Sequence, residues 1–202
     1  MRTRWIGAGA VALLLLAALA VGSRHSGAVS AGELKTAVFA GGCFWCMEAA
    51  FDEVDGVTET TSGYAGGTTP DPTYGQHEGY QEAVRVTYDP AKVAYAKLLD
   101  QYWHNIDPFD AAGQFCDKGE AYRSVVFYGD DAEKRLADQT KQEIADRFKQ
   151  PVATEIRPFT TFTPAEWYHQ DFHIKNAVKY NYYKTGCGRP QRLEEIWGPP
   201  PS

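Results

Sequence analysis

The chain has little methionine and little cysteine, and it lacks an excess of basic residues. Two of its 202 residues are Met, four are Cys, and the formal net charge is −6. An acidic chain is poorly suited to the phosphate backbone of nucleic acid, so we expect no nucleic-acid partner. Four cysteines are too few to form a disulfide scaffold in a chain of this length, which makes them candidates for chemistry.

Internal repeats, low-complexity tracts and blocks of like charge are also absent from the sequence. These absences argue against solenoids, disordered tails and arrays of small modules. Residues 32–202 are about 170 residues long, which suits one domain with a sizeable core. We therefore expect a single folded domain over 32–202.

The first 31 residues have the pattern of an export signal. Arg2 and Arg4 precede an apolar run over 5–21, and the small residues Val29-Ser30-Ala31 suit a signal peptidase. The alternative is an uncleaved membrane anchor, because about 17 apolar residues is the short limit for a bilayer span. Cleavage near Ala31 would leave a periplasmic or secreted enzyme. It would remove three arginines and no acid, so the charge would change from −6 to −9.

The stretch Gly41-Gly42-Cys43-Phe44-Trp45-Cys46 carries the strongest chemical signal. It lies between a predicted strand over 36–40 and a predicted helix over 48–54, so Cys43 is expected at a strand-to-helix corner. The positive end of a helix favours a thiolate, which is the nucleophilic form of cysteine. Two large aromatics at a tight turn cannot both enter one core, so at least one should line a pocket.

Other interpretations of these cysteines remain open from the residues alone. Cys43 and Cys46 have the spacing of a zinc knuckle, but Cys116 and Cys187 stand alone and supply no second knuckle. The same spacing permits a thioredoxin-like redox pair, and simple packing is the commonest fate of a cysteine. A redox pair would make the protein a thiol–disulfide oxidoreductase. Metal binding or simple packing would make it a non-catalytic domain.

Two histidines invite a second metal hypothesis. His169 and His173 are four residues apart, as in helical zinc proteases, but Gln170 stands where those enzymes need glutamate. We therefore expect no metal here and give His169 a structural or site-supporting role. Cys187 lies between two glycines near the end of the chain, which predicts a mobile tail and suits a resolving thiol.

The remaining periodicity predicts alternating strands and helices with long loops. Strands are expected over 57–63, 82–88, 122–128 and 152–162, helices over 93–105, 130–150 and from Thr163, and loops over 64–79 and 107–121.

Seven further blocks follow Gly42-Cys43-Phe44-Trp45 in a fixed order. They read Gly-Tyr-Ala-Gly-Gly at 63–67, Pro-Thr-Tyr at 72–74, Glu-Ala-Val-Arg-Val at 82–86, Tyr-Asp-Pro at 88–90, Asp-Pro at 107–108, Tyr-Arg-Ser at 122–124 and Ala-Glu-Trp-Tyr-His-Gln at 165–170. With the first motif they make the chain resemble the A-type peptide methionine sulfoxide reductases from about residue 35 to 183. The resemblance implies an α+β fold with a mixed sheet layered with helices, and an irregular C-terminal tail.

The resemblance also implies an activity, the reduction of methionine S-sulfoxide in oxidised proteins, in peptides or as the free amino acid. Cys43 would be the nucleophile and Glu82 the acid that protonates the sulfoxide oxygen. Further side chains would complete the site. They are Tyr74 and Tyr122 as donors to that oxygen, Asp117 as an organiser through water, and Phe44 with Trp45 around the substrate methyl group.

The implied cycle ends with a sulfenic acid on Cys43, which a second thiol condenses with to form a disulfide. Cys46 and Cys187 are both candidates, with a slight preference for Cys187 because of its reach. A thioredoxin-like dithiol would then reduce the disulfide, with no bound cofactor and a monomeric enzyme. One departure concerns the acid, because Gly79-Tyr80-Gln81-Glu82 stands where the family usually has Gly-His-Ala-Glu.

Overall fold

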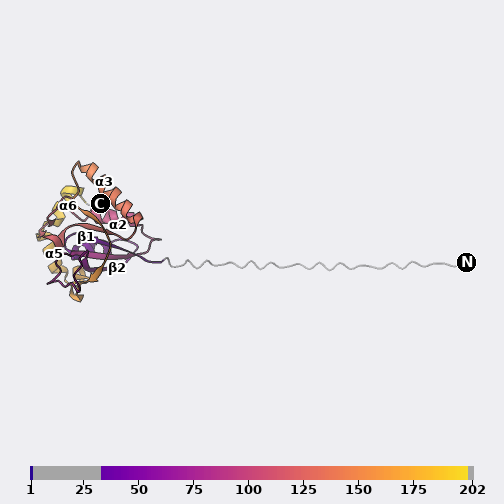
Figure 1. The fold of residues 1–202 in the computed structure, drawn as a ribbon, viewed down its shortest axis with the longest axis horizontal. Coiled ribbons are helices and arrows are strands. Elements are labelled where there is room, and N and C mark those ends of the chain that lie inside the picture. The colour runs from indigo at the N-terminus through magenta and orange to yellow at the C-terminus, as the bar shows by residue number, and fades with distance from the viewer. Residues whose placement is uncertain (2–32, 200–202) are drawn as a thin grey trace. The chain divides into compact units, whose positions relative to one another are not determined.

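The computed structural model describes Met1 and residues 33–199. The predicted leader or anchor over residues 1–31 lies almost entirely outside the described residues. In the part that is described, no helix has both the length and the apolar character needed to cross a membrane. Figure 1 shows the folded part, in which helices pack outside a central sheet.

One mixed sheet of six strands forms the centre of the described fold. Its order is β7-β6-β1-β3-β2-β8, and all neighbours are antiparallel except β6 and β7. The strands are β1 (Lys35–Ala40), β2 (Val57–Ala65), β3 (Gln81–Tyr88), β6 (Val125–Tyr128), β7 (Glu155–Pro158) and β8 (Phe162–Pro164). A two-stranded hairpin of β4 (Gly113–Gln114) and β5 (Asp117–Lys118) lies apart from this sheet.

The helices occupy the positions between these strands and at the C-terminus. They are α1 (Phe44–Asp52), α2 (Tyr95–Trp103), α3 (Asp131–Phe148), α4 (Phe172–Lys175), α5 (Ala177–Gly186) and α6 (Arg189–Trp197), with 3-10 turns at Glu120–Tyr122 and Trp167–His169. The predicted α+β class is confirmed.

The sheet curls until its two edges approach each other. Strands β7 and β8 lie at opposite edges, yet only residues 159–161 connect them. Arg157 on β7 reaches across to donate to the Gly66 carbonyl just beyond β2, at 3.1 Å. The predicted single strand over 152–162 is therefore wrong, because this stretch supplies one short strand to each edge.

Both faces of the central strand β1 are buried. Ala37 and Phe39 point into the main core with α1 and α2, whereas Val38 and Ala40 point into a smaller cluster inside the curl. This alternation is the period-2 pattern of a strand, and burial on both faces explains why β1 reads as a continuous apolar run. The end of β1 is thus a rigid base for the turn that follows it.

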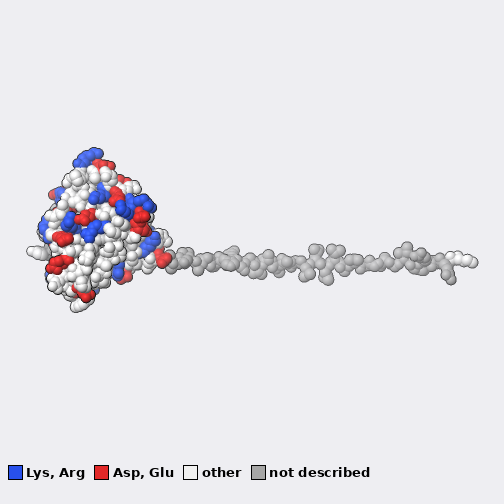
Figure 2. Space-filling view, in the orientation of Figure 1, with Lys and Arg blue, Asp and Glu red and all other residues white. Residues whose placement is uncertain are grey.

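Charges of both signs are mixed on the surface. On the face that Figure 2 shows, Lys and Arg side chains alternate with Asp and Glu side chains over the described residues. Neighbouring charges of opposite sign partly cancel, so the described part of this face carries no broad basic stripe of the kind that follows a phosphate backbone.

Two predictions about the C-terminal third are wrong. No regular helix begins at Thr163, because Glu166 does not cap a helix but accepts hydrogen bonds from the Tyr64 hydroxyl and the Tyr74 backbone N–H. The expected irregular tail is helical instead, as α5 and α6. The local pattern does not indicate this, because α5 and α6 hold few buried residues of their own.

Candidate active site

The nucleophile candidate lies on a turn that only glycine can form. Gly42 has a φ of +79°, and a Cβ there would lie 2.5 Å from the Cβ of Gln114. Cys43 follows as the N-cap residue of α1, so the helix begins four residues earlier than the predicted Glu48. The side chain of Cys43 therefore lies at the helix start, as the sequence indicated.

The acid candidate meets this turn from the neighbouring strand. Glu82, near the start of β3, is 2% exposed and accepts a hydrogen bond from the Phe44 backbone N–H at 3.1 Å. Burial raises the pKa of Glu82 to about 8, although that hydrogen bond acts in the opposite direction. A carboxyl group that keeps its proton at neutral pH can serve as a general acid.

One small cavity of about 50 Å³ brings these groups together. It is lined by Cys43, Phe44, Trp45, Tyr74, Glu82, Asp117, Tyr122 and Tyr183. Seven of these eight residues are among the nine predicted from the sequence, and the seven come from five separate segments. The other two predicted residues, Cys46 and Cys187, are not part of the lining. Tyr122 belongs to the 3-10 turn rather than to the strand predicted over 122–128.

The two phenols assigned to the substrate oxygen are protonated donors at neutral pH. Burial, together with the negative charge of Glu82, raises the pKa of both Tyr74 and Tyr122. Each hydroxyl can therefore offer a proton to an oxygen that gains negative charge in the cavity.

The indole of Trp45 is held from behind by two aromatic rings. Its Nε1 donates to Nδ1 of His169 at 3.2 Å, and its ring stacks on Phe172 at 3.8 Å between centroids. His169 is buried, and burial lowers its pKa, so the ring is the neutral acceptor that this bond requires. His169 thus lies behind Trp45 and does not line the cavity.

The protonation of Cys43 and Cys46 depends on their contact with each other. Burial raises the pKa of Cys43 well above its usual value, and the effect outweighs a hydrogen bond from Tyr183. The hydrogen bond with Cys43 is the main reason that the pKa of Cys46 falls to about 6, and nearby Arg189 acts in the same direction. The two sulfurs therefore titrate as one pair, and their contact favours a single negative charge on the pair.

A family model described as peptide methionine sulfoxide reductase matches residues 35–200. The chain belongs to the peptide methionine sulfoxide reductase A family. It is 47% identical over 191 residues to peptide methionine sulfoxide reductase MsrA 2 of Caulobacter vibrioides, covering 92% of this chain and 97% of that relative. It is 46% identical to MsrA of Bacillus subtilis, over 81% of this chain and 96% of the relative.

Solved structures of the same family resemble the fold. Mxr1 of Saccharomyces cerevisiae in reduced form matches with a TM-score of 0.66 and 29% identity, over 72% of this chain and 87% of Mxr1. Methionine sulfoxide reductase A of Corynebacterium diphtheriae matches with a TM-score of 0.65 and 28% identity, over 72% of this chain and 76% of that one. Mxr1 of Saccharomyces cerevisiae in complex with Trx2 matches with a TM-score of 0.52 and 25% identity, over 69% of this chain and 85% of that chain.

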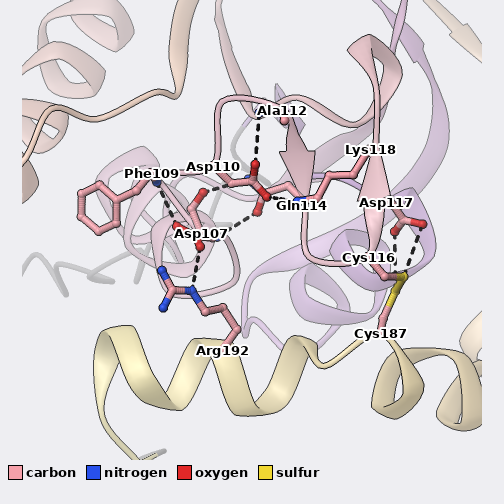
Figure 3. Close-up of polar contacts among 10 residues, drawn as sticks. All are labelled: Asp107, Phe109, Asp110, Ala112, Gln114, Cys116, Asp117, Lys118, Cys187 and Arg192. Atoms are coloured by element: carbon pink, nitrogen blue, oxygen red, sulfur yellow. Dashed lines mark hydrogen bonds and ion pairs between the residues drawn. A yellow bond between two sulfur atoms is a disulfide. The ribbon is translucent and has the colours of Figure 1, made fainter.

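Cys187, the second candidate for the resolving thiol of a peptide methionine sulfoxide reductase, is not a free thiol in this structure. It forms a disulfide with Cys116, which Figure 3 shows beside the carboxylate of Asp117. Two residues further on, the buried Arg189 donates to the carbonyls of Gly41 and Asn105, at 3.0 and 2.6 Å. These contacts pack the start of α6 against the turn that carries Cys43.

Tyr183 is a site residue that sequence reasoning missed. It lies on α5 and donates a hydrogen bond to Asp117, and its hydroxyl also contacts the Cys43 sulfur. Nothing in the local pattern separates it from its neighbours, because three tyrosines occur within four residues at 180–183. Its role depends on a long-range contact between the tail and the hairpin.

The departures from the usual family pattern lie beside the cavity rather than in its wall. The Tyr80 hydroxyl donates to the Thr69 carbonyl and so fastens the preceding loop. Gln81 accepts from Arg157 at 3.0 Å, on the opposite face of β3 from Glu82. Neither residue is part of the cavity lining, so they support the loop and the curl of the sheet.

Among the described residues, one group of three possible metal-ligand atoms lies close together. It consists of Cys116, Asp117 and Cys187, with all three atoms within 4.8 Å of one another. Two of these atoms are joined in the disulfide, and thiolates are the form that binds metal. His169 and His173 do not converge, since His169 faces Trp45 and His173 faces two carboxylates.

Proposed function

We propose that the protein is a peptide-methionine (S)-S-oxide reductase that repairs oxidised methionine, either protein-bound or free. The observation that carries this proposal is the meeting of Cys43 with a protonated, buried Glu82 in one small aromatic cavity. Membership of the family supports the choice of substrate, and the S epimer follows the family. Binding of nucleic acid, metal, flavin or nicotinamide plays no part in the proposal.

The first step transfers the sulfoxide oxygen to Cys43. The Cys43 sulfur attacks the substrate sulfur, while its proton passes to the Cys46 thiolate with which it shares a hydrogen bond. Glu82 donates its proton to the oxygen, and Tyr74 and Tyr122 stabilise the developing negative charge. The net products are methionine and a sulfenic acid on Cys43, so the sulfur of the substrate is reduced and that of Cys43 is oxidised.

The aromatic walls would select the group attached to the substrate sulfur. Phe44 is fully buried, and its ring lies 6.2 Å from that of Trp45 between centroids. Such a corner accepts a methyl group at little cost, whereas a charged or hydroxylated group would lose its hydrogen bonds to water there. Asp117 would organise the other side of the site, in contact with Tyr183.

The second step closes a disulfide and releases water. Cys46 is the better candidate for the resolving thiol, because it already contacts Cys43, whereas Cys187 is bonded to Cys116. Its thiol attacks the sulfenic sulfur and displaces the hydroxyl group as water. A thioredoxin-like dithiol would then reduce the Cys43–Cys46 disulfide. The complex that Mxr1 forms with Trx2 supports a reductant of this class.

Turnover of methionine S-sulfoxide with dithiothreitol by the full chain tests this function. We expect methionine formation that Cys43→Ser reduces to background and that Glu82→Gln reduces by about 100-fold. Reduction of insulin disulfides is the matched assay for the rival thiol–disulfide oxidoreductase, which needs no acid. Insulin reduction that survives Glu82→Gln, with no sulfoxide turnover by the unmodified chain, would overturn the proposal in favour of that rival.

Export of a monomeric enzyme is also part of the proposal, supported by the pattern of residues 1–31. Expression of the full chain in a bacterium, followed by N-terminal mass analysis of the periplasmic and membrane fractions, tests it. We expect a soluble product that begins near residue 32. Full-length protein in the membrane fraction would support the anchor, and full-length protein in the cytoplasm would contradict export.

A further inference from the structure

Three ionisable side chains, of which Glu48 is buried, meet beside Trp45 on one side of α1 and take no part in the proposed chemistry. Glu48 is completely buried, and neither of its carboxylate oxygens has a hydrogen-bond partner. The facing group is the ring of His173, whose Nδ1 lies 3.8 Å from Glu48 Oε2. A buried carboxylate without a cation or a donor is costly, so this contact requires an explanation.

A second carboxylate approaches the same ring from the next turn of α1. Asp52 Oδ2 lies 3.3 Å from His173 Nε2, and its other oxygen accepts a hydrogen bond from Thr60 at 2.7 Å. His173 thus bridges two carboxylates, with one ring nitrogen facing each. With a proton on both nitrogens the ring can offer a donor to each of them. The Tyr180 ring packs edge-on against His173, at 6.0 Å between centroids.

The same face of α1 carries the indole that lines the cavity. Trp45, Glu48 and Asp52 are spaced by three and four residues, so they lie on one side of the helix. Helix α4 covers this side with two consecutive residues. Phe172 stacks on Trp45 with an interplanar angle of 10°, and His173 meets the two carboxylates.

Helix α4 has few local interactions that could fix its position. It is four residues long, and Asp171 before it has a φ of +54° and makes no capping hydrogen bond with its side chain. So short a helix is unstable in isolation, and its position depends on tertiary contacts. The contacts that Phe172 and His173 make with α1 therefore help to determine where α4 lies, together with the hydrogen bonds between Gln170, just before the helix, and the Ser62 backbone.

We propose that His173 is a positioning residue. By bridging the two carboxylates it seats α4 on α1, and so holds the Trp45 indole in the wall of the cavity. The inference rests on the proposed function in one respect, since the wall contacts substrate only if methionine sulfoxide is bound there. The placement of Trp45 itself does not depend on any reaction.

The first test measures KM and kcat of the full-chain variant His173→Gln at neutral pH. We expect KM to rise by about tenfold while kcat changes by less than about threefold, because Cys43 and Glu82 are untouched. His104→Gln is the matched control, since His104 also faces a carboxylate, that of Asp100 at 3.1 Å, but lies on the surface away from the cavity. Equal KM values in the two variants would overturn the proposal.

The double variant Glu48→Gln/His173→Gln tests whether the charges matter rather than the volume of the ring. Two facing amides can hydrogen-bond without a cation, so we expect KM to return to within about threefold of the unmodified value. A KM as high as that of the single variant, in a protein that unfolds at the same urea concentration as the unmodified chain, would overturn the proposal.

A fluorescence measurement applies even if no turnover is found. The emission of Trp45 is taken as the difference between each chain and the same chain carrying Trp45→Phe, at neutral pH. We expect emission at longer wavelength in His173→Gln than in the unmodified chain, and no such difference in the double variant. If His173→Gln does not fold, Asp52→Asn takes its place, because it removes one of the two carboxylates that the ring bridges. Equal emission in the unmodified chain and in the variant, or an equal shift in the double variant, would contradict the proposal.

Discussion

Cys43 and Cys46 lie three residues apart at the start of α1 and are both buried, whereas Cys116 and Cys187 are separated by 71 residues and meet at the rim of the cavity. The inner pair consists of free thiols that share a hydrogen bond, and the outer pair is already a disulfide. The proposed function gives the chemistry to the inner pair, because this pair contains Cys43. The outer pair joins the segments that carry Asp117 and Tyr183, and its two bonded sulfurs also have the arrangement of a redox pair.

The outer disulfide is one of several links between the tail and the same loop. Arg192 on α6 donates to Asp107 at 2.8 Å, as Figure 3 shows, and Trp197 donates to the Ile106 carbonyl at 3.2 Å. Reduction of the disulfide would therefore leave α6 in place. The comparison teaches that a cysteine between two glycines can be fixed by contacts on either side of it.

The largest effect on turnover is expected from replacing one cysteine of each pair and comparing the two variants. Cys46→Ser should lower steady-state turnover with thioredoxin by about 100-fold, because the sulfenic acid on Cys43 then has no neighbouring thiol. Cys187→Ser should change it by less than about threefold. Assays coupled to thioredoxin measure the steady-state turnover of the two variants. The yield of methionine in a single turnover is the control for the first step. The reverse order would return the resolving role to Cys187.

An effect of intermediate size is expected from pH, which changes the protonation of Glu82 and of the inner cysteine pair. Because the pKa of Cys46 is about 6 and that of Glu82 about 8, kcat/KM should be bell-shaped, falling as Cys46 gains a proton at low pH and as Glu82 loses one at high pH. Rates measured from pH 5 to 10 check this. A rate that rises steadily to pH 10 would show that no protonated carboxyl group is needed.

The Glu82 carboxyl group also affects the stability of the fold, and this effect is smaller than its effect on the rate. The fold raises the pKa of Glu82 from 4.5 to about 8, so the folded protein binds more protons than the unfolded chain, and stability falls as pH rises through this window. Glu48 acts in the same direction, since burial raises its pKa to about 7. Glu82→Gln should therefore melt higher than the unmodified chain at pH 9, by about 10 °C, and at the same temperature at pH 4. Calorimetry of the two proteins at pH 4 and at pH 9 measures these melting temperatures.

The smallest effect on activity is expected from removal of the outer disulfide. Cys116→Ser/Cys187→Ser should retain turnover within about threefold, and should lower the free energy of unfolding by about 2–4 kcal/mol because the loop that the bond closes is long. Urea denaturation and turnover of the same preparation provide the comparison. A loss of activity as large as that of Cys46→Ser would assign chemistry to the outer pair.

Local pattern predicts the parts of the site that depend on short stretches of chain. The corner at Cys43 follows from a buried strand, two glycines and a helix. The family resemblance supplies Glu82, Tyr74, Tyr122 and Asp117, because a carboxylate at the start of a strand is more often solvated and no periodicity distinguishes the other three from other loop residues. The structure brings all of these to one cavity.

The parts that sequence could not predict are pairings between distant segments. The Cys116–Cys187 disulfide, the contact of Tyr183 with Asp117, and the bridge made by His173 all join the tail to residues far earlier in the chain. Periodicity reports which face of an element is apolar, but it does not report which partner that face meets. The tail is helical although the resemblance implied an irregular one, and it makes several of its contacts with the rest of the domain through polar side chains.

The two hydrogen bonds of Arg189 have a consequence for how the enzyme is made. This guanidinium group holds the Gly41 carbonyl, two residues before the reactive sulfur, although it is encoded almost 150 codons later. A nascent chain that stops before residue 189 would thus leave the catalytic turn unsupported. Incomplete products of translation would lack the hydrogen bond that holds this turn.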